Sequence, residues 1–308
     1  MSTVSLQFWY ALKRPAIHHP LFRKITRDRL PRPQPKLSLG QQVVVMALCV
    51  LPAYFILRYY ADMIVVGILF IPLGIAAVYM TLHGTIAGLY WALRISGAIA
   101  RERERGTFDL ISTSPYGAFS ASWAICTGCQ YYDQTFNGIG AQRVWFSRIF
   151  FLTLLLLSAI ISLIEPRSTS AAINNCLYVA TVVVTLSLAF VIDDIHSAVI
   201  GSLVGMIVPL IVRNRLNAHL GALAGFLTLQ VTAYMLVWLI GFTLLPQINA
   251  KLALGELAAS LMLPLEQVLI FFAVRELIAR GLWRVHTLLL DGDVSDLSLL
   301  TKGGRLIC

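Results

Sequence analysis

The chain has 308 residues, of which 58% are hydrophobic and only 13% are charged, and its mean hydropathy is +0.77. A soluble globular protein carries about twice that charged fraction. The composition therefore excludes a soluble enzyme and a disordered chain, and it indicates a polytopic membrane protein. The 24 Lys and Arg residues outnumber the 15 Asp and Glu residues. Because the surplus gathers in the first 40 residues and at the ends of apolar stretches, it indicates membrane topology and not nucleic-acid binding.

Residues 1–40 form a basic N-terminal segment. Its first part places apolar and aromatic side chains before Lys13 and Arg14, which suits a membrane interface. Its second part is rich in basic residues, and Pro31, Pro33 and Pro35 exclude a continuous helix there. We interpret this part as a solvated cytoplasmic tail that fixes orientation, with contact to anionic lipids as a second role. No secretory signal is expected, because apolar sequence follows only after the basic segment.

Seven apolar stretches come next, and a bilayer core of about 30 Å requires about 20 helical residues for each crossing. The stretches are residues 42–57, 63–93, 144–164, 173–192, 198–212, 220–245 and 261–277. The N-terminal segment and the basic stretch after residue 275 both favour the cytoplasm, so the number of crossings should be even.

We therefore expect an all-α, polytopic membrane helix bundle over residues 41–290, with about six transmembrane helices. Residues 198–212 are the first candidate for a re-entrant segment, and residues 117–132 are a candidate for an extra crossing. The stretch 63–93 is longer than one crossing requires, and we expect it to project into the cytoplasm. A polar C-terminal tail occupies residues 291–308.

Some apolar stretches carry glycines four residues apart, a spacing that lets helix backbones approach closely in lipid. The pairs are Gly84 with Gly88, Gly201 with Gly205, and Gly221 with Gly225. They are consistent with a helix-packing or dimer interface, and equally with the ordinary glycine usage of membrane helices.

The most informative pattern lies in residues 94–116, between the second and third spans. Its four arginines place this segment in the cytoplasm; they are Arg94, Arg101, Arg103 and Arg105. On a helix, Glu102 pairs with Arg105 and Arg101 with Glu104 at i,i+3 spacing. The first part of the segment is therefore expected to be a charged helix.

A second, shorter helix is expected after this charged helix. Gly106 interrupts the first helix, and Thr107 is suited to cap the second. Asp109 falls in the first turn, where a carboxylate complements the helix dipole, and Ser114 followed by Pro115 ends the helix. A structure of this kind, lying along the membrane surface, can transmit force from a soluble partner to the spans.

Residues 94–116 resemble the coupling element of ATP-binding-cassette (ABC) transporter permeases of the type-2, exporter-like class. The pattern of that element is approximately I-A-x-E-x-E-x-G-T-x-x-x-L-x-x-[ST]-P. The matching residues are Ile99, Ala100, Glu102, Glu104, Gly106, Thr107, Leu110 or Ile111, Ser114 and Pro115. The chain departs from the family at Lys24, where an acidic residue is common. It departs again in residues 117–143, a longer and more polar connector that we expect to be cytoplasmic.

The resemblance implies a permease subunit that forms a pore with a second permease, as a homodimer or a heterodimer, and docks a cytoplasmic ABC ATPase. The residues that it assigns to the ATPase-facing surface are Arg101, Glu102, Arg103, Glu104, Arg105, Gly106, Thr107, Asp109, Ser114 and Pro115. None of them would be catalytic. The sequence contains no G-x-x-x-x-G-K-[ST] P-loop, so ATP and magnesium are expected on the partner.

We accordingly expect a transporter subunit that is not itself an enzyme and has no cofactor, metal or nucleic-acid site. It is expected in a bacterial-type inner (plasma) membrane, in contact with the lipid bilayer, as a multi-pass protein with both termini cytoplasmic. The substrate is not indicated by the sequence.

Several other polar groups are candidate sites. Cys126 and Cys129 form a C-x-x-C pair, but a closed zinc site requires two further ligands, so we interpret them as reduced cysteines in a loop. Asp193, Asp194 and His196 form an acidic cluster that we interpret as a polar loop ending a span, although a proton-coupled carrier would place such groups at mid-bilayer. The remaining intramembrane candidates are Glu266, Arg275 and Glu276.

Two alternatives to the permease interpretation stay open. The chain could be a non-transporting membrane scaffold subunit of a larger complex, because a fold does not fix a function. It could also be a secondary carrier or channel, although charged residues away from the span ends are few. A membrane enzyme is the least supported, because no paired carboxylates or nucleophile–base set stands out.

Overall fold

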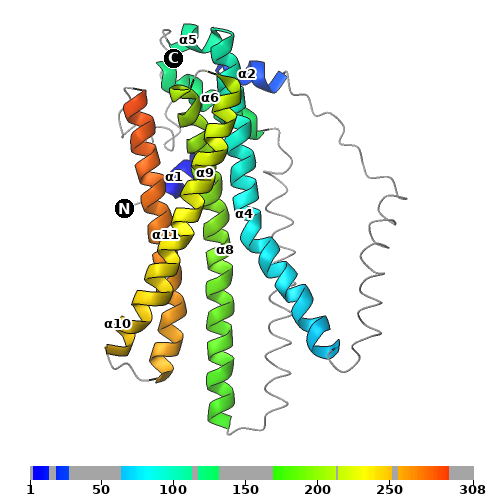
Figure 1. Cartoon of the computed structure of the whole chain (residues 1–308), viewed down its shortest axis with the longest axis vertical. Helices are drawn as coiled ribbons and strands as arrows, with labels where there is room; N and C mark the ends of the chain where they lie inside the picture. The colour runs from blue at the N-terminus through cyan, green and yellow to red at the C-terminus, as the bar shows by residue number, and fades with distance from the viewer. Residues whose placement is uncertain are drawn as a thin grey trace, which may run out of the picture.

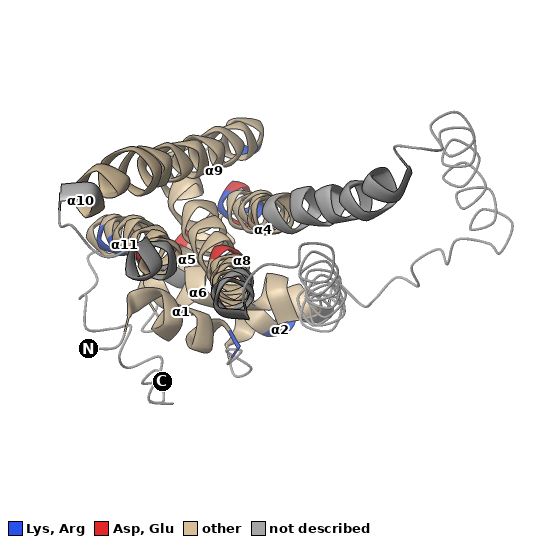
Figure 2. Ribbon diagram, turned by 90° about the horizontal axis from the view of Figure 1, so that it is seen from below, with Lys and Arg blue, Asp and Glu red and all other residues tan. Residues whose placement is uncertain are grey.

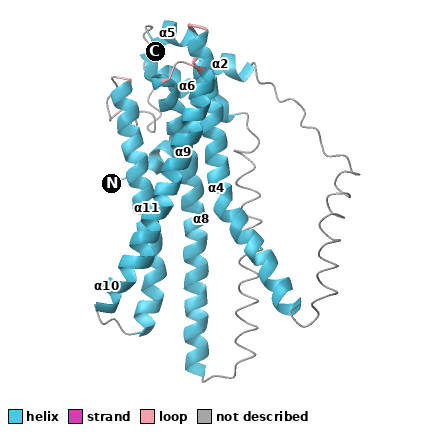
Figure 3. Ribbon diagram, viewed as in Figure 1, coloured by secondary structure: helices cyan, strands magenta, loops and turns pink. Residues whose placement is uncertain are grey.

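The structure, a computed structural model, describes residues 3–13, 19–27, 64–112, 117–131, 169–212, 214–251 and 256–290. Every element within these ranges is a helix, and no strand occurs among them (Figure 3). The all-α prediction is therefore confirmed for this part of the chain.

Two helical segments within the described ranges are long and apolar enough to cross a membrane, Ala180–Ile211 and Arg215–Asn249. The predicted spans at residues 42–57 and 144–164 lie outside the described residues, as does the predicted tail at residues 291–308. The number of crossings therefore stays a prediction.

Long helices build the body of the molecule, four short helices lie toward one end of it, and the short helix α10 (Leu245–Lys251) lies toward the other (Figure 1). The long helices are α4 (Ile64–Glu104), α8 (Thr169–Ile211), α9 (Arg215–Trp238) and α11 (Glu256–Leu289). The four short helices toward the first end are α1 (Val4–Leu12), α2 (Pro20–Arg27), α5 (Thr107–Ser112) and α6 (Gly117–Tyr131). We call this end of the bundle the α5 end.

Helix α8 joins two stretches that the sequence analysis separated. The predicted spans 173–192 and 198–212 form one helix of 43 residues, so residues 198–212 are not a re-entrant segment. The predicted polar loop around Asp193 is also wrong, because that residue lies inside the helix. Asp193, His196 and Ser197 are buried at i, i+3 and i+4, so one face of α8 is polar and turned inward while the helix continues.

Helix α4 has 41 residues and extends to Glu104, which agrees with the expectation that the stretch 63–93 continues beyond one crossing. At 1.5 Å per residue it is about 60 Å long, roughly twice the bilayer core.

Glycines allow α4 and α8 to pack backbone against backbone. A methyl group added at Gly201 would lie 2.8 Å from the carbonyl carbon of Gly88 and closer still to its oxygen. One added at Gly205 would lie 2.8 Å from the carbonyl oxygen of Ala92. The helix-packing interpretation of these glycines is therefore confirmed, and the packing lies within one chain.

Helix α9 follows α8 after a short turn and runs antiparallel to it (Figure 1). The chain stays helical beyond the last residue of α9. Asn214 caps α9 by accepting a hydrogen bond from the Leu216 backbone N–H at 3.0 Å. The chain then forms the π-helix η1 (Leu239–Leu244) and α10 (Leu245–Lys251). Pro246 therefore does not end the helix, because a proline is tolerated in a first helical turn.

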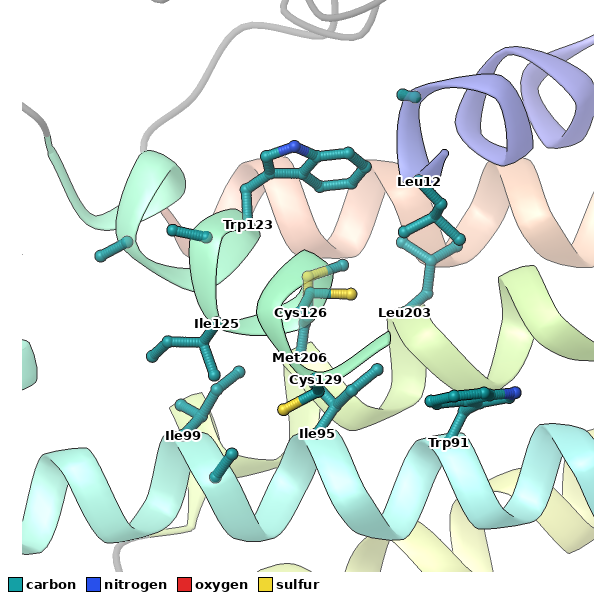
Figure 4. Packing of buried hydrophobic residues seen from close by; sticks show 14 of the residues in the cluster. Leu12, Trp91, Ile95, Ile99, Trp123, Ile125, Cys126, Cys129, Leu203 and Met206 are labelled. Atoms are coloured by element: carbon teal, nitrogen blue, oxygen red, sulfur yellow. The ribbon is translucent and has the colours of Figure 1, made fainter. Parts of the chain in front are cut away.

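Helix α6 is a core helix and not the polar connector predicted for residues 117–143. Every residue from Ser120 to Gln130 is buried, because this run is small or apolar on all sides. Trp123, Ile125 and Cys126 belong to one buried hydrophobic cluster with Ile95 of α4 and Leu203 of α8 (Figure 4). Residues 132–143 lie outside the described residues.

Large apolar side chains are exposed along the outer faces of the long helices. Those on α9, η1 and α10 include Leu216, Leu220, Leu227, Val231, Met235, Leu236, Trp238, Leu239, Phe242, Leu244 and Ile248. Seen from below in Figure 2, few charged residues interrupt the described helices. An apolar surface this extensive marks a face that is covered by lipid or by another protein.

Candidate functional site

The break between α4 and α5 lies at Gly106, as the sequence predicts. Its backbone has a φ of +69°, in the left-handed region that glycine adopts without strain. The Gly106 carbonyl accepts a hydrogen bond from the Leu110 N–H at 3.2 Å, so Gly106 takes the cap position and Thr107 is the first residue of α5. Thr107 was predicted as the cap and is one residue off, whereas Asp109 lies in the first turn as predicted. Ser114 and Pro115 lie outside the described residues.

Glu102 faces another helix of this chain. Its side chain is only 2% exposed, and its Oε2 lies 2.6 Å from the Nζ of Lys24 on α2. Its Oε1 lies 3.5 Å from Arg105, which is the predicted i,i+3 pair. Lys24 is thus the partner of Glu102, and the pair fastens α2 to the end of α4.

The next two residues reach the turn between α8 and α9. Arg103 donates hydrogen bonds to the carbonyl oxygens of Pro209 and of Leu210, the latter at 3.0 Å. Glu104 Oε1 accepts a hydrogen bond from the Arg215 backbone N–H at 3.2 Å. A cation at the last carbonyls of one helix and a carboxylate at the first N–H groups of the next both suit the helix dipoles. The end of α4 therefore contacts both sides of the α8–α9 turn, the last residues of α8 and the first residue of α9.

Part of the predicted ATPase-facing surface is left open to solvent. Glu104, Arg105 and Asp109 are exposed, and the Leu110 side chain is 74% exposed. Arg101 is half-buried, with its Nε buried and without a hydrogen-bond partner. The structure thus separates the predicted site into inward-facing residues, which hold helices together, and an exposed face around α5.

A second group of polar residues, which we call the buried charged cluster, lies between α4, α8, α9 and α11. At its centre is Arg275 of α11, which is fully buried and forms an ion pair with Asp193 of α8. Arg275 also donates a hydrogen bond to Ser197 Oγ at 2.9 Å, and its guanidinium lies 5.0 Å from the ring centroids of Tyr234 and Phe271.

Helices α4 and α9 contribute neutral polar groups to the cluster. Tyr234 donates a hydrogen bond to Asp193 Oδ1 at 3.1 Å. The Gln230 amide nitrogen lies 2.8 Å from Thr85 Oγ1 and 3.2 Å from Ser197 Oγ. One hydrogen-bonded network therefore joins all four long helices.

Glu276, the neighbour of Arg275, turns to a different set of partners. Its carboxylate accepts hydrogen bonds from the backbone N–H of Val4 at 2.7 Å and of Ser5 at 3.3 Å, and from the Ser5 hydroxyl. It also accepts from Arg280 Nε at 3.0 Å, and it lies 3.7 Å from His196 Nε2. This carboxylate caps the N-terminus of α1 and ties that helix to α11 and α8.

A further acidic residue approaches α4 where that helix has no side chain. A methyl group added at Gly84 would lie 2.7 Å from Asp194 Oδ1, and it would also clash with the Asp193 carboxylate. His83 Nδ1 lies 3.5 Å from Asp194 Oδ1. Gly84 therefore makes room for two neighbouring carboxylates.

The charged members of this cluster were predictable from the sequence, but their proximity was not. Thr85, Gln230 and Tyr234 were not predicted as members. The available signal was the i,i+4 spacing of Gln230 and Tyr234 on an otherwise apolar helix, because polar groups in such helices usually face a polar partner. Glu266, the other candidate, accepts a hydrogen bond from Asn249 Nδ2 at 2.7 Å and stands apart from the cluster.

The C-x-x-C pair lies in α6, and not in a loop. Cys126 and Cys129 are reduced thiols, fully buried in the apolar core (Figure 4). Burial raises the pKa of the Cys126 thiol well above its usual value, which disfavours the reactive thiolate. Within the ranges that the structure describes, no three His, Cys, Asp or Glu residues are arranged to hold a metal ion.

Comparison with known proteins finds no match to this chain. No family model matches the sequence, no curated protein is significantly similar to it, and no solved structure matches its fold.

Proposed function

We propose that this chain is the membrane-spanning permease subunit of an ABC-type transporter, which exports its substrate with ATP hydrolysed by a separate ATPase subunit. One observation carries the proposal. At the α5 end, the long helix α4 is followed by the short helix α5, whose outer face is exposed. The last residues of α4 form ion pairs and hydrogen bonds with α2, α8 and α9. A partner bound to α5 would act on all of these helices at once.

The exposed apolar faces support the membrane part of the proposal. Leu82 and Ile86 on α4, Leu188 and Val191 on α8, and Leu269 on α11 are all at least 43% exposed. In water these exposed apolar side chains would favour aggregation, whereas the hydrocarbon core of a membrane solvates them. We place these faces in a bacterial-type plasma membrane and the α5 end in the cytoplasm, on the side that the basic segments favour.

The inward-facing charges support the transmission part. A force on α5 reaches α4 directly, then α2 through Lys24 and Glu102, and the α8–α9 turn through Arg103 and Glu104. In this proposal Glu102 and Arg103 hold helices together, and the docking face consists of Arg105, Asp109 and Leu110. A second permease, identical or different, would complete the pore.

The test is purification of the tagged chain in mild detergent, followed by identification of stoichiometric partners and an ATPase assay. We expect a P-loop ATPase at about one copy per chain. A Leu110→Arg variant should lose it, because this side chain is 74% exposed at the docking face. Leu288→Arg is the matched control, since Leu288 is 78% exposed on α11, and it should retain the ATPase. A stable chain without any ATPase would contradict the proposal.

A secondary carrier remains the second candidate, and one observation favours it. The buried charged cluster lies well inside α8 and α11, whereas the sequence suggested few charges away from the span ends. Ionisable groups in such positions often belong to ion or proton pathways. Transport by the chain reconstituted alone, driven by an ion gradient without ATP, would favour this candidate over the permease.

A further inference from the structure

We infer that α4 carries a binding site for the phosphate group of an anionic phospholipid, centred on Arg94 and flanked by His219 of α9 and by Arg101. The inference rests on the membrane part of the proposed function, because it requires that α4 enter a bilayer with the α5 end in the cytoplasm. It does not require an ATPase partner, so it applies to a permease and to a carrier alike.

One stripe along α4 changes its chemistry in chain order. Its exposed members are Leu82, Ile86 and Tyr90, and the half-buried Arg94 and Arg101 follow. Successive members are four or seven residues apart, so each lies beside the next on the helix surface. Aromatic side chains gather at the level of the lipid headgroups, and arginines gather on the cytoplasmic side. The order of the stripe therefore places the first arginine at the headgroups of the cytoplasmic leaflet.

Two aromatic neighbours fix the position of the Arg94 guanidinium. Its Nη1 donates a hydrogen bond to the Tyr90 hydroxyl at 2.7 Å. Its central carbon lies 5.6 Å from the ring centroid of Tyr90 and 5.8 Å from that of Trp91. The planar guanidinium has five N–H donors in a fork that matches the oxygens of a phosphate. A fork that is already oriented loses less side-chain entropy when it binds.

His219 and Arg101 complete the basic character of the site. Gly97 lies on α4 one turn from each arginine, and a methyl group added there would lie 2.6 Å from His219 Nε2. The imidazole of α9 therefore rests against the α4 backbone between the two arginines. Arg101 is seven residues beyond Arg94, which is about 10 Å along the helix. That distance is about one Debye length, so its charge also attracts an anion to the site.

Carboxylates do not occupy the middle of this surface. Helix α9 contains no Asp or Glu, and those of α4 are Glu102 and Glu104, at its last turn. Glu102 is already paired with a lysine. Asp193 and Asp194 of α8 approach α4 at Gly84, about 15 Å from the site along the helix. The site is therefore basic overall and complements an anion.

The surface beside the site favours a lipid over a soluble phosphate. Ile86 of α4 is 62% exposed one turn before Tyr90, and Leu220, which follows His219 on α9, is 55% exposed. A phospholipid supplies a phosphate and two acyl chains in one molecule, so its chains can cover these apolar side chains. A lipid with net negative charge is expected, because the cytoplasmic leaflet is rich in such lipids and basic residues attract them.

The test is native mass spectrometry of the full-length chain in mild detergent, titrated with phosphatidylglycerol. We expect the wild-type chain to bind phosphatidylglycerol several times more tightly than phosphatidylcholine. Arg94→Gln should weaken phosphatidylglycerol binding about fivefold, which is the contribution of one arginine near an anionic surface. Arg94→Lys keeps the charge without the fork and should lose less. The matched control is Arg284→Gln, which changes an exposed arginine of α11 and should leave binding unchanged.

A second variant keeps the test decisive if Arg94→Gln is not folded by circular dichroism. Tyr90→Phe removes only the hydroxyl that orients the guanidinium, so it should also weaken binding, by less than Arg94→Gln. Unchanged binding in folded Arg94→Gln and Tyr90→Phe would overturn the inference, and so would an equal loss in Arg284→Gln or equal binding of phosphatidylcholine. Displacement of the lipid by glycerophosphoglycerol, the headgroup without acyl chains, would overturn the choice of a lipid over a soluble phosphate. The titration contains no ATPase, so its failure and the failure of the proposed ATPase docking are separate results.

Discussion

Replacement of Gly201 by alanine perturbs the closest approach of two helices in the structure. The added methyl group would lie 2.8 Å from the carbonyl carbon of Gly88 and 3.0 Å from its Cα. Non-bonded carbon atoms prefer about 3.5–4.0 Å. Because the obstructing atoms are backbone, no side chain can rotate away, and α4 would have to move about 1 Å from α8.

Such a movement would loosen neighbouring contacts along the same helix pair, including the approach of Gly205 to Ala92. Overpacking a core costs about 1–3 kcal/mol, and an obstruction made of backbone belongs at the upper end of that range. We therefore expect Gly201→Ala to lower the free energy of unfolding by about 3 kcal/mol, which is about a hundredfold in the folded-to-unfolded ratio.

Gly281 of α11 provides a chemically identical control. A methyl group there meets nothing within 4 Å, and alanine is a better helix former than glycine. We expect Gly281→Ala to be neutral or up to about 1 kcal/mol more stable. Equilibrium unfolding in mild detergent, followed by circular dichroism, compares the two variants. If Gly201→Ala were as stable as Gly281→Ala, the close packing of α4 on α8 would be wrong.

Three further perturbations test other parts of the structure. Arg275→Met leaves the Asp193 carboxylate buried without its counter-charge and should lower the free energy of unfolding by about 3–5 kcal/mol. The double variant with Asp193→Asn should recover most of that loss. Equilibrium unfolding of the two single variants and the double variant measures this, and additive losses would refute the pairing. Glu102→Lys should loosen α2, measured as faster protease cleavage near residue 27, and Lys24→Glu should restore protection in the double variant; no restoration would refute the contact. His286 lies outside the predicted spans, and burial lowers its pKa to about 4. As the pH falls, the unfolded chain therefore binds a proton at this residue below about pH 6.5, whereas the folded chain binds it only near pH 4. Stability should therefore fall by about 3 kcal/mol as the pH falls through that window, and a His286→Phe variant that kept this pH dependence would refute the assignment.

Elements with a local signal were predictable from the sequence. The break at Gly106 follows from a glycine between two charged or amphipathic runs, and the structure gives it a positive φ. The end of α8 before Asn214 follows from a polar stretch that contains a capping residue. Composition alone indicated the helical class.

Features that depend on tertiary partners were not predictable. Asp193 looks like the end of a span because a lone carboxylate is costly in an apolar helix, and only the position of Arg275 on another helix removes that cost. Glu102 was assigned to the ATPase-facing surface, because its partner Lys24 lies 78 residues earlier in the chain and no local pattern connects the two. Local patterns reveal where a charge stands but not which distant residue it meets.

The central claim is that the exposed face at the α5 end docks a cytoplasmic ATPase, and site-specific photo-crosslinking in native membranes tests it most directly. A photoreactive amino acid at Leu110 should capture one P-loop ATPase, because the side chain there is 74% exposed beside α4. The same probe at Leu269, which is 66% exposed on the apolar face of α11, should capture lipid and no ATPase. Capture of an ATPase at Leu269 alone, or of lipid at Leu110, would contradict the account.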